Sequence, residues 1–406
     1  MANIINIDVL IVGSGPAGTS TALHLVQQDP SWSDRLVVVD KAIHPREKLC
    51  GGGITHMGQN VLGRLGLAIE TPSIALRRAD ILYEDLSYSF QANPIFVIIR
   101  RDEFDHWFVQ KAEARGVRVR QGEAVDNVEV YDDFVEVTTD KAVFRAKVLV
   151  AADGSRSFVR RKLKWDDNSR VARLLEILTP EDSQLSPEFR EKKAVLDFTP
   201  MKDGLQGYYW DFPSVIEGET YMNRGLFDSR AQPKRPKADL KRELRRSLDA
   251  RDRNLDDYKL KGHPIRWFDG NGRYAIPRVL LAGDAAGTDP LAGEGISFSL
   301  AYGDVAAAAI VDAFAQDDFS FADYKERIVA HQVLKQLPVR VRLARLMYRL
   351  GKYRWISRFA WRAIGFVMRY SRWNDPEYVP IQKPVQVHEP EEERSRPYSH
   401  QYVKDG

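Results

Sequence analysis

Cysteine is almost missing from this chain of 406 residues, with Cys50 as its single example. One cysteine cannot form an intrachain disulfide, and it excludes zinc and iron–sulfur sites that need several thiolates. We therefore predict no metal site. Because disulfides accompany oxidising compartments, a chain that cannot form one internally is better suited to a reducing compartment.

Long uncharged apolar segments are missing as well. None reaches the roughly 18 residues that a membrane-spanning helix needs, so the sequence predicts no such helix. The first residues, MANIINIDVLIVGSG, lack the basic segment and the cleavage site of a signal peptide. Hydrophobic residues make up 44 % of the chain and charged residues 29 %, as in globular proteins. We expect a cytoplasmic protein with one large core or two domains.

The turn after the first predicted strand carries a dinucleotide fingerprint. A buried strand at 9–12 is followed by Gly13, Gly15 and Gly18, and then by a helix. In such a turn the first glycine permits the sharp bend and the second lets the backbone approach a pyrophosphate, while the third allows close helix packing. Asp40 ends the next strand, where an acid accepts hydrogen bonds from ribose hydroxyls. A dinucleotide site is predicted; a glycine turn without a ligand is the alternative.

Three later segments indicate which dinucleotide is bound. KVLVAADGSRS (147–157) ends a strand in Asp153-Gly154, and RVLLAGDAAGTDPLAGEGIS (278–297) ends another in Gly283-Asp284. IIRRDEFDHW (98–107) places Arg101 at the head of a helix. Two distant glycine turns can clamp an extended dinucleotide at its middle, which a simple nicotinamide domain does not require. Asp284 in the last turn is also a natural helix N-cap, and we expect it to be both a cap and a cofactor contact.

These motifs, spread over about residues 5–330, resemble the flavoprotein group that contains para-hydroxybenzoate hydroxylase and the geranylgeranyl reductases. The resemblance implies FAD as the cofactor and an α/β fold. In that group the late Gly-Asp segment contacts the ribityl chain and the pyrophosphate, and the arginine lies near the cofactor. The adenine meets a backbone at the position of Val125. The cofactor contacts so implied, beyond the fingerprint itself, are Ala17, Arg101, Val125, Asp284, Gly295 and Ile296.

The stretch REKLCGGGITHMG (46–58) follows Asp40 and joins the cysteine to three glycines. A run of glycines favours neither helix nor strand. Either the loop is flexible, or its backbone must approach another group, such as a ligand, very closely. The stretch resembles geranylgeranyl reductases, with a similar one in flavin-dependent halogenases. The amides of Gly51, Gly52 and Gly53, which have no side chains, would lie against the flavin ring, and Cys50 near its reactive edge. The alternative is a surface loop with a buried structural cysteine.

A second motif, GYYWDFPSV (207–215), places Tyr208, Trp210 and Phe212 on one face of a strand. It resembles the Y-x-W-x-F-P signature of geranylgeranyl reductases, which lines the substrate cavity. The family follows it with a spaced G-x-G, whereas here Asn223-Arg224-Gly225 stands later. Packing of an ordinary sheet core is the alternative.

The C-terminal region is basic and aromatic. Between Gln332 and Asn374 there is no acidic residue. Basic and aromatic residues on helices are typical of an interface with anionic lipid, so we expect a peripheral contact with the inner membrane face. Packed helices with a solvated basic face, or a nucleic-acid surface, are the alternatives, and we expect no nucleic acid. The eleven basic residues are Lys335, Arg340, Arg342, Arg345, Arg349, Lys352, Arg354, Arg358, Arg362, Arg369 and Arg372.

The expected fold is α/β, with an FAD-binding Rossmann-type domain, a mixed-sheet substrate domain and a C-terminal helical region. Both domains are expected to be discontinuous in the sequence. The expected FAD-binding domain is 1–75, 96–165 and 269–330; the substrate domain is 76–95 and 166–268; the basic aromatic helical region is 331–379, and a disordered tail is 380–406.

The predicted function is reduction of isolated C=C bonds in a geranylgeranyl-type prenyl lipid by an FAD-dependent oxidoreductase. Electrons would come from NAD(P)H or a small redox protein. Cys50 and Tyr208 are the candidate catalytic residues, and Tyr208, Trp210 and Phe212 the candidate substrate contacts. An FAD-dependent monooxygenase or halogenase on the same scaffold is the enzymatic alternative, the halogenase needing a lysine beside the path from flavin to substrate. The non-enzymatic alternative is a membrane-associated carrier or scaffold that binds flavin and catalyses no reaction.

Overall fold

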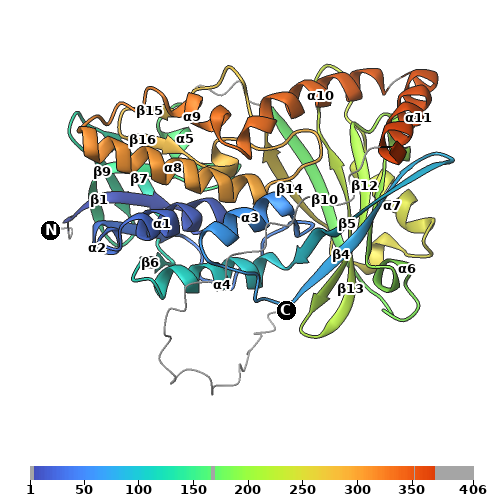
Figure 1. Ribbon diagram of the computed structural model, residues 1–406, viewed down its shortest axis with the longest axis horizontal. Helices are drawn as coiled ribbons and strands as arrows, with labels where there is room; N and C mark the ends of the chain where they lie inside the picture. The colour runs from blue at the N-terminus through green and yellow to red at the C-terminus, as the bar shows by residue number, and fades with distance from the viewer. Residues whose placement is uncertain (1–3, 166–169, 352, 371–406) are drawn as a thin grey trace.

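The computed structural model describes residues 4–165, 170–351 and 353–370. The molecule contains two eight-stranded sheets at opposite ends of its long axis. Sheet A lies beside the N-terminus and sheet B at the other end (Figure 1). The expected α/β class, with a Rossmann-type domain, a mixed second sheet and C-terminal helices, is confirmed. The predicted tail at 380–406, and Lys352 and Arg372 of the predicted basic region, lie outside the described residues.

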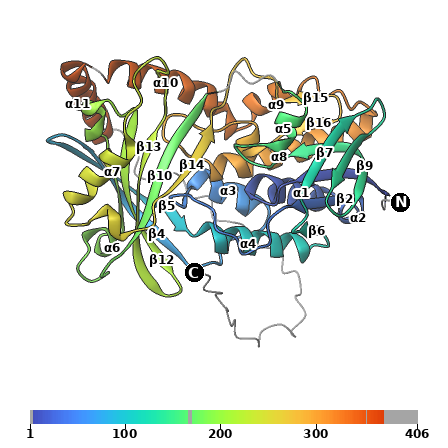
Figure 2. The ribbon, with the colours of Figure 1, turned by 180° about the vertical axis from the view of Figure 1, so that it is seen from behind.

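Sheet A has a parallel centre in the order β16-β9-β1-β2-β6, with β15 antiparallel at one edge and the β7–β8 hairpin continuing from β9 (Figure 2). Its central strands are continuous apolar runs because they are buried on both faces, as parallel sheets usually are. The strands are β1 (Ile4–Val12), β2 (Leu36–Asp40), β6 (Arg118–Gln121), β7 (Val125–Val130), β8 (Val135–Thr139), β9 (Val143–Ala151), β15 (Ala275–Ile276) and β16 (Val279–Leu281).

Sheet B is mostly antiparallel, in the order β14-β10-β13-β12-β11-β4-β5-β3, with one parallel pair between β11 and β4. Its strands alternate between two cores. Tyr209 of β12 packs into a cluster with leucines of helix α7, whereas Tyr208 and Trp210 face the opposite side. The strands are β3 (Gly53–Thr55), β4 (Ser73–Tyr83), β5 (Leu86–Ile99), β10 (Val171–Pro180), β11 (Lys193–Asp197), β12 (Gly207–Ile216), β13 (Glu219–Asp228) and β14 (Lys261–Arg266).

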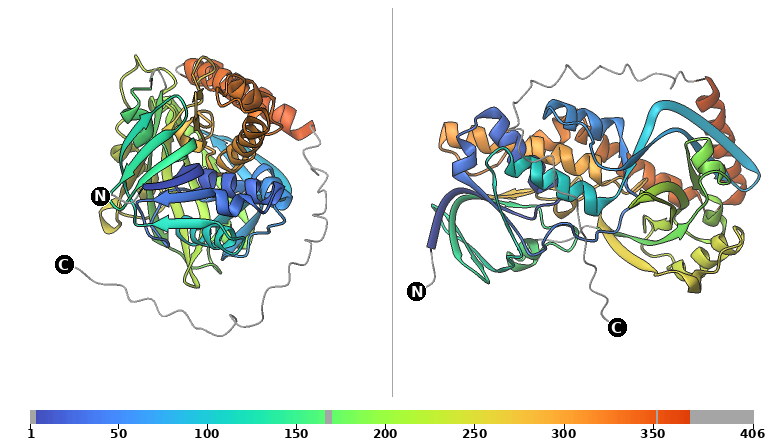
Figure 3. Two further views of the ribbon diagram at one scale, coloured as in Figure 1. Left: turned by 90° about the vertical axis from the view of Figure 1, so that its left-hand side faces the viewer. Right: turned by 90° about the horizontal axis from the view of Figure 1, so that it is seen from below.

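The helices form a layer over sheet A and a separate arm over sheet B. Helices α1, α3 and α8 pack together beside sheet A, and α10 and α11 lie over the outer end of sheet B (Figures 1 and 3). The helices are α1 (Pro16–Gln28), α2 (Trp32–Arg35), α3 (His56–Arg64), α4 (Arg101–Glu113), α5 (Phe158–Lys162), α6 (Pro187–Arg190), α7 (Leu240–Asp249), α8 (Ile296–Gln316), α9 (Tyr324–Ala330), α10 (Leu337–Leu350) and α11 (Arg354–Tyr370).

Within the described ranges, α8 alone has the length and hydropathy of a membrane span, and two acidic residues, Asp304 and Asp312, interrupt it. About 67 % of its most apolar window is buried inside the protein, where it packs on α1 and α3. A buried core helix accounts for this composition.

Candidate functional site

One large cavity runs from the carboxyl ends of the sheet A strands to the inner face of sheet B. Its volume is about 1760 Å³. Single small-molecule sites usually span roughly 300–1,000 Å³, so this cavity has room for more than one ligand. Every site residue predicted from the sequence except Gly18 lines it: Gly13, Gly15, Ala17, Asp40, Cys50, Gly51, Gly53, Arg101, Val125, Tyr208, Trp210, Phe212, Asp284, Gly295 and Ile296.

The glycine turn between β1 and α1 forms the first wall. Gly13 has φ +105°, and a Cβ there would lie 2.7 Å from the carbonyl carbon of Ala152, so only glycine fits. Gly15 is the N-cap of α1, and its open side lies against Arg46. Gly18 packs against the Gly13 carbonyl, where any side chain would separate helix from strand. The turn therefore leaves backbone and the positive end of α1 facing the cavity.

Asp40 lies beside this turn at the end of β2. Its Oδ2 accepts hydrogen bonds from the Ser14 amide at 2.7 Å and the Ser14 hydroxyl at 2.8 Å, and its Oδ1 accepts one from the Ala42 amide. A carboxylate has about four lone-pair sites, so Asp40, which lines the cavity, keeps one acceptor position for a ligand. Glu123, which the sequence analysis missed, lines the cavity near Asp40 and is buried against Arg120.

A buried cation cluster faces the middle of the cavity. On α4, Arg101 makes two hydrogen bonds of 2.8 Å to Asp105, and Arg46 approaches the same carboxylate at 3.1 Å. Asp105 is buried, so one negative charge is shared by two arginines and a net positive charge remains. That charge suits a phosphate-bearing ligand. The position of Arg101 at the head of a helix was predicted from the sequence, whereas the role of Arg46 was not.

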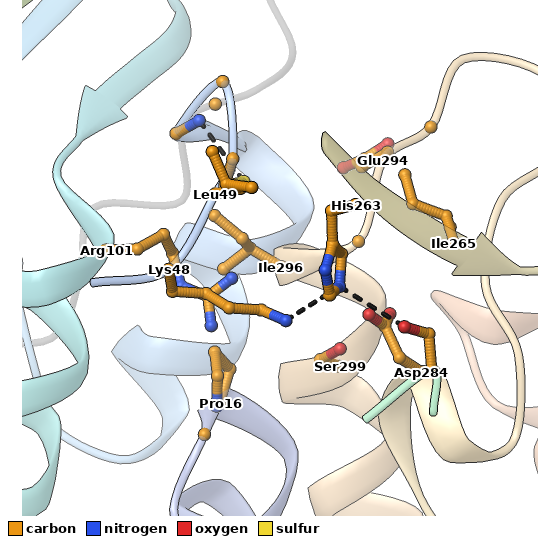
Figure 4. A pocket seen from close by; sticks show the side chains of 18 of the residues that line it. Pro16, Lys48, Leu49, Arg101, His263, Ile265, Asp284, Glu294, Ile296 and Ser299 are labelled. Carbon is orange, nitrogen blue, oxygen red and sulfur yellow. Dashed lines mark hydrogen bonds between the residues drawn. The ribbon is translucent and has the colours of Figure 1, made fainter. Parts of the chain in front are cut away.

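Lys48 and His263 meet near Asp284 (Figure 4). The Lys48 Nζ lies 2.8 Å from His263 Nε2, and the Ser155 hydroxyl lies 3.3 Å from the same nitrogen. Burial, followed by the charge of Lys48, lowers the pKa of His263 to about 3, so the imidazole is neutral and its Nε2 accepts a hydrogen bond from the Lys48 ammonium. Burial lowers the pKa of Lys48 to about 8, with the Asp284 charge opposing that shift. Neither residue was predicted from the sequence.

Asp284 corrects one expectation. It lies in a short 3₁₀ turn, Gly283–Ala285, whose N-cap is Ala282, and α8 begins instead after Gly295. Asp284 therefore caps no helix, because the turn from 286 to 295 separates it from α8. Its carboxylate instead accepts a 3.4 Å hydrogen bond from Thr288 and lines the cavity opposite Lys48.

The cysteine-glycine stretch forms a loop across the middle of the cavity. Gly52 has φ +78° and lies so close to the Ile99 carbonyl that a side chain would collide with it. The Cys50 Sγ accepts a 3.4 Å hydrogen bond from the Gly52 amide. Burial raises the pKa of the Cys50 thiol, although Arg101 opposes the effect. At neutral pH the side chain is therefore a neutral thiol, which is a poor nucleophile.

The aromatic strand β12 holds this loop from the other side. The Trp210 Nε1 donates to Asn223 Oδ1 at 2.9 Å, and Asn223 Nδ2 donates to the Cys50 carbonyl at 3.1 Å. The Phe212 ring packs against Gly51. Gly225 pairs with Trp210 across the β12–β13 ladder, and a Cβ there would lie 2.5 Å from the indole. The late Asn-Arg-Gly segment therefore supplies the bridge and the space for the indole.

Tyr208 closes the same wall. It is 6 % exposed, and its hydroxyl donates to the Ala292 carbonyl in the turn before α8. Burial, followed by the charges of Asp289 and Glu294, raises the pKa of its phenol, which stays protonated. The hydroxyl thus joins sheet B to the glycine turn at 293–295.

Glu176 lies buried behind the loop, on β10. Burial raises the pKa of its carboxyl to about 7, against the smaller opposing effect of Arg100. Its Oε2 is buried without a hydrogen-bond partner among the described residues. The neutral carboxylic acid is therefore the favoured form of this side chain below about pH 7.

The far end of the cavity is apolar. It lies between the β4–β5 hairpin and the inner face of β12, and α11 contributes two residues to it. An uncharged chain would gain only apolar contact area there. The aliphatic and aromatic lining at this end includes Ile81, Phe90, Ile95, Phe96, Leu196, Ala363 and Ile364.

The geometry fits FAD: a glycine turn without space for side chains, an acid beside it, two arginines sharing one carboxylate, and volume to spare. The family model described as "FAD binding domain" matches residues 6–309. A menaquinone reductase from Mycolicibacterium smegmatis is 30 % identical over 333 residues, 74 % of this chain and 75 % of that protein. Digeranylgeranylglycerophospholipid reductase 2 from Methanopyrus kandleri is 26 % identical over 340 residues, 77 % of this chain and 79 % of that protein.

Solved structures share the fold. A geranylgeranyl bacteriochlorophyll reductase-like protein from Thermoplasma acidophilum aligns with TM-score 0.73 and 18 % identity over 91 % of this chain and 93 % of that one. The halogenase PltM aligns with TM-score 0.68 and 17 % identity over 89 % of this chain and 80 % of its own. The resemblance inferred from the motifs is therefore confirmed, while the fold by itself is common to reductases and halogenases.

Proposed function

Because this chain belongs to the FAD binding domain family of flavin-dependent oxidoreductases, with a match over residues 6–309, we propose that it reduces isolated C=C bonds in a geranylgeranyl-type prenyl lipid. The observation that carries this proposal is the apolar arm of the cavity, which continues directly from the FAD cradle. Two relatives named as reductases of a geranylgeranyl lipid and of menaquinone support it. NAD(P)H or a small redox protein supplies the electrons.

The chemistry that FAD would supply when bound and reduced is a hydride for one alkene carbon, and the other carbon would take up a proton. The protein's role is to position the prenyl segment and to exclude water from it. Trp210 and Phe212 offer flat apolar faces, and Asn223 fixes the Trp210 ring by its hydrogen bond. An isolated alkene is a poor hydride acceptor, so positioning must contribute much of the rate.

Cys50 and Tyr208 take different roles in this proposal. The Cys50 thiol keeps its proton because burial raises its pKa, and it shapes the cavity without adding charge. The Tyr208 hydroxyl already donates to the Ala292 carbonyl, which favours a role in orienting the chain over a role as proton donor. Cys50→Ala and Tyr208→Phe should each lower turnover about tenfold or more while leaving FAD bound. Tyr209→Phe, on the opposite face of β12, is the matched control.

An oxygen-using halogenase or monooxygenase is the second candidate. Lys48 favours it, because a halogenase needs an amine near the path between flavin and substrate, and Lys48 lines the cavity.

A single turnover tests the proposal. The flavoprotein is reduced without oxygen and mixed with geranylgeranyl diphosphate or a geranylgeranyl lipid in detergent, and the product is weighed by mass spectrometry. Flavin reoxidation with a gain of two hydrogen atoms for each double bond supports alkene reduction. Reaction only after air is admitted, with gain of oxygen or of a supplied halide, moves the protein to the second candidate. Flavin binding without turnover under any of these conditions leaves the carrier role.

A further inference from the structure

Helix α11 carries a row of exposed aromatic side chains. Trp355, Phe359 and Phe366 are 75 %, 72 % and 65 % exposed. They occupy positions i, i+4 and i+11, which fall on one side of an α-helix. The other side of α11 buries Trp361 in the main core. A row of large exposed aromatics is costly in water and usually marks a contact surface.

Helix α10 repeats the arrangement. Its exposed apolar residues Val339, Leu343 and Leu346 follow at i, i+4 and i+7, opposite a buried row that packs on the protein. Beside them runs a basic row, Arg342, Arg345 and Arg349, also exposed. Each helix therefore presents one apolar face to the core and a second apolar face to solvent.

The α11 surface is held rigidly. Arg358 forms ion pairs with Glu84 and Asp85 in the turn between β4 and β5. Trp361 stacks on Tyr83 with ring centroids 5.7 Å apart. Figure 3 shows α11 beside this hairpin at the end of sheet B. The aromatic row is thus fixed outward by contacts on the opposite side of the helix.

We propose that the exposed faces of α10 and α11 dock on the surface of a bilayer that contains anionic phospholipids. The apolar rows would enter the headgroup region, and the flanking arginines would contact lipid phosphates. No acidic residue interrupts the sequence from 332 to 374, and the exposed basic residues of this segment complement a negative surface. The exposed basic residues of this docking surface are Lys335, Arg342, Arg345, Arg349 and Arg362, whereas Arg354 forms an ion pair with Glu84 of the β4–β5 turn.

The docking surface adjoins the cavity. Ala363 and Ile364 of α11 line its apolar end, and Ile364 is also 40 % exposed. A prenyl chain could therefore pass from the bilayer into the cavity without crossing water. This entry route rests on the proposed function, whereas docking rests on the two helices alone.

Two other occupants are less compatible with these residues. Nucleic acid would pair with the arginines but would leave the aliphatic side chains Leu343 and Leu346 in water. A second copy of the chain would bring one basic row against another, and like charges facing each other oppose association.

Vesicle sedimentation tests docking with the FAD-loaded protein. The vesicles are phosphatidylcholine with about one-third phosphatidylglycerol, compared with phosphatidylcholine alone. The protein should bind the anionic vesicles, and Phe359→Glu should weaken binding about tenfold or more. Leu185→Glu is the matched control. Leu185 is 74 % exposed but belongs to the loop between β10 and α6, outside the docking surface of α10 and α11.

The charge contribution has its own pair of variants. Each basic residue near an anionic surface contributes about fivefold to binding, so changing Arg342, Arg345 and Arg349 to glutamine should weaken it about 100-fold. A control triple at the exposed Lys141, Lys147 and Lys162, beside sheet A at the opposite end of the molecule (Figure 1), loses the same charge and should bind within a few fold of wild type. Equal loss in both triples would show a non-specific charge effect and overturn the proposal.

Three further results would overturn docking: no binding to anionic vesicles, self-association abolished by Phe359→Glu, or tight binding of RNA or DNA through the same arginines. Turnover separates the entry route from the proposed function. With prenyl lipid in anionic vesicles, Phe359→Glu should lose about tenfold in rate, and with the same lipid in detergent it should match wild type. Equal rates on vesicles would refute the entry route, whereas inactivity of wild type in detergent would refute the proposed function and leave docking intact.

Discussion

Replacement of Glu176 by glutamine should remove a pH dependence from the stability of the protein. Burial raises the pKa of this carboxyl from its ordinary 4.5 to about 7 in the folded state. Between those two pH values the folded state binds more protons than the unfolded state. Stability therefore falls as pH rises through that window, and the loss is complete above about pH 7.

The size of the effect follows from the same two values. Each tenfold change in proton affinity corresponds to about 1.4 kcal/mol, so the rise from 4.5 to about 7 gives an upper value of about 3 kcal/mol. Glutamine has nearly the same shape and no charge to bury. Glu176→Gln should therefore resemble wild type near pH 4.5 and exceed its unfolding free energy by up to about 3 kcal/mol above pH 7.

The assay is urea unfolding of both proteins across this pH window at a fixed excess of FAD, since bound ligand adds to stability. Glu219→Gln, an exposed carboxyl on the neighbouring strand β13, is the control and should track wild type. If Glu176→Gln loses as much stability as wild type between the two pH values, Glu176 does not titrate as its burial implies. The inference that burial behind the Cys50 loop raises the pKa of Glu176 would then be wrong.

Three other changes probe the cavity. Gly13→Ala should abolish FAD binding, because the added methyl group would collide with the Ala152 backbone. Flavin absorbance of the purified protein measures this loss. The control Gly66→Ala should retain FAD, because Gly66 also has a positive φ but has open space around it. Lys48→Met should weaken FAD binding about tenfold below pH 8, because it removes a positive charge. The affinity of the wild-type protein for FAD should decline above about pH 8, where Lys48 loses its proton. Flavin fluorescence measures both affinities. Gly225→Ala should lower the unfolding free energy by about 1–3 kcal/mol by forcing Trp210 to move; an unchanged urea midpoint would contradict that packing.

The parts of the site that lie within one contiguous unit were predictable from the sequence. Gly13, Gly15 and Asp40 belong to a single strand-turn-helix-strand segment, in which residue types and spacing define both the bend and the acid position. Alternation along β12 likewise predicted that Tyr208 and Trp210 share a face. Such local patterns need no knowledge of distant partners.

The prediction that Asp284 caps a helix failed for a physical reason. A glycine-aspartate pair before an apolar helix is a good local signal for an N-cap. Here the turn from 286 to 295 lies between that pair and α8, so the helix begins after Gly295. Sequence spacing cannot tell which of several glycines ends a turn.

The chain itself determined the βαβ turn, the acid at Asp40 and the aromatic face of β12, because each depends on neighbours a few residues away. Only the tertiary structure brought Lys48 to His263, 215 residues later, and Asn223 to Cys50, 173 residues earlier. It also buried Glu176 behind the cysteine loop. Side-chain contacts between sheets depend on strand order and register, and burial then sets the proton affinities, so neither can be read from local sequence.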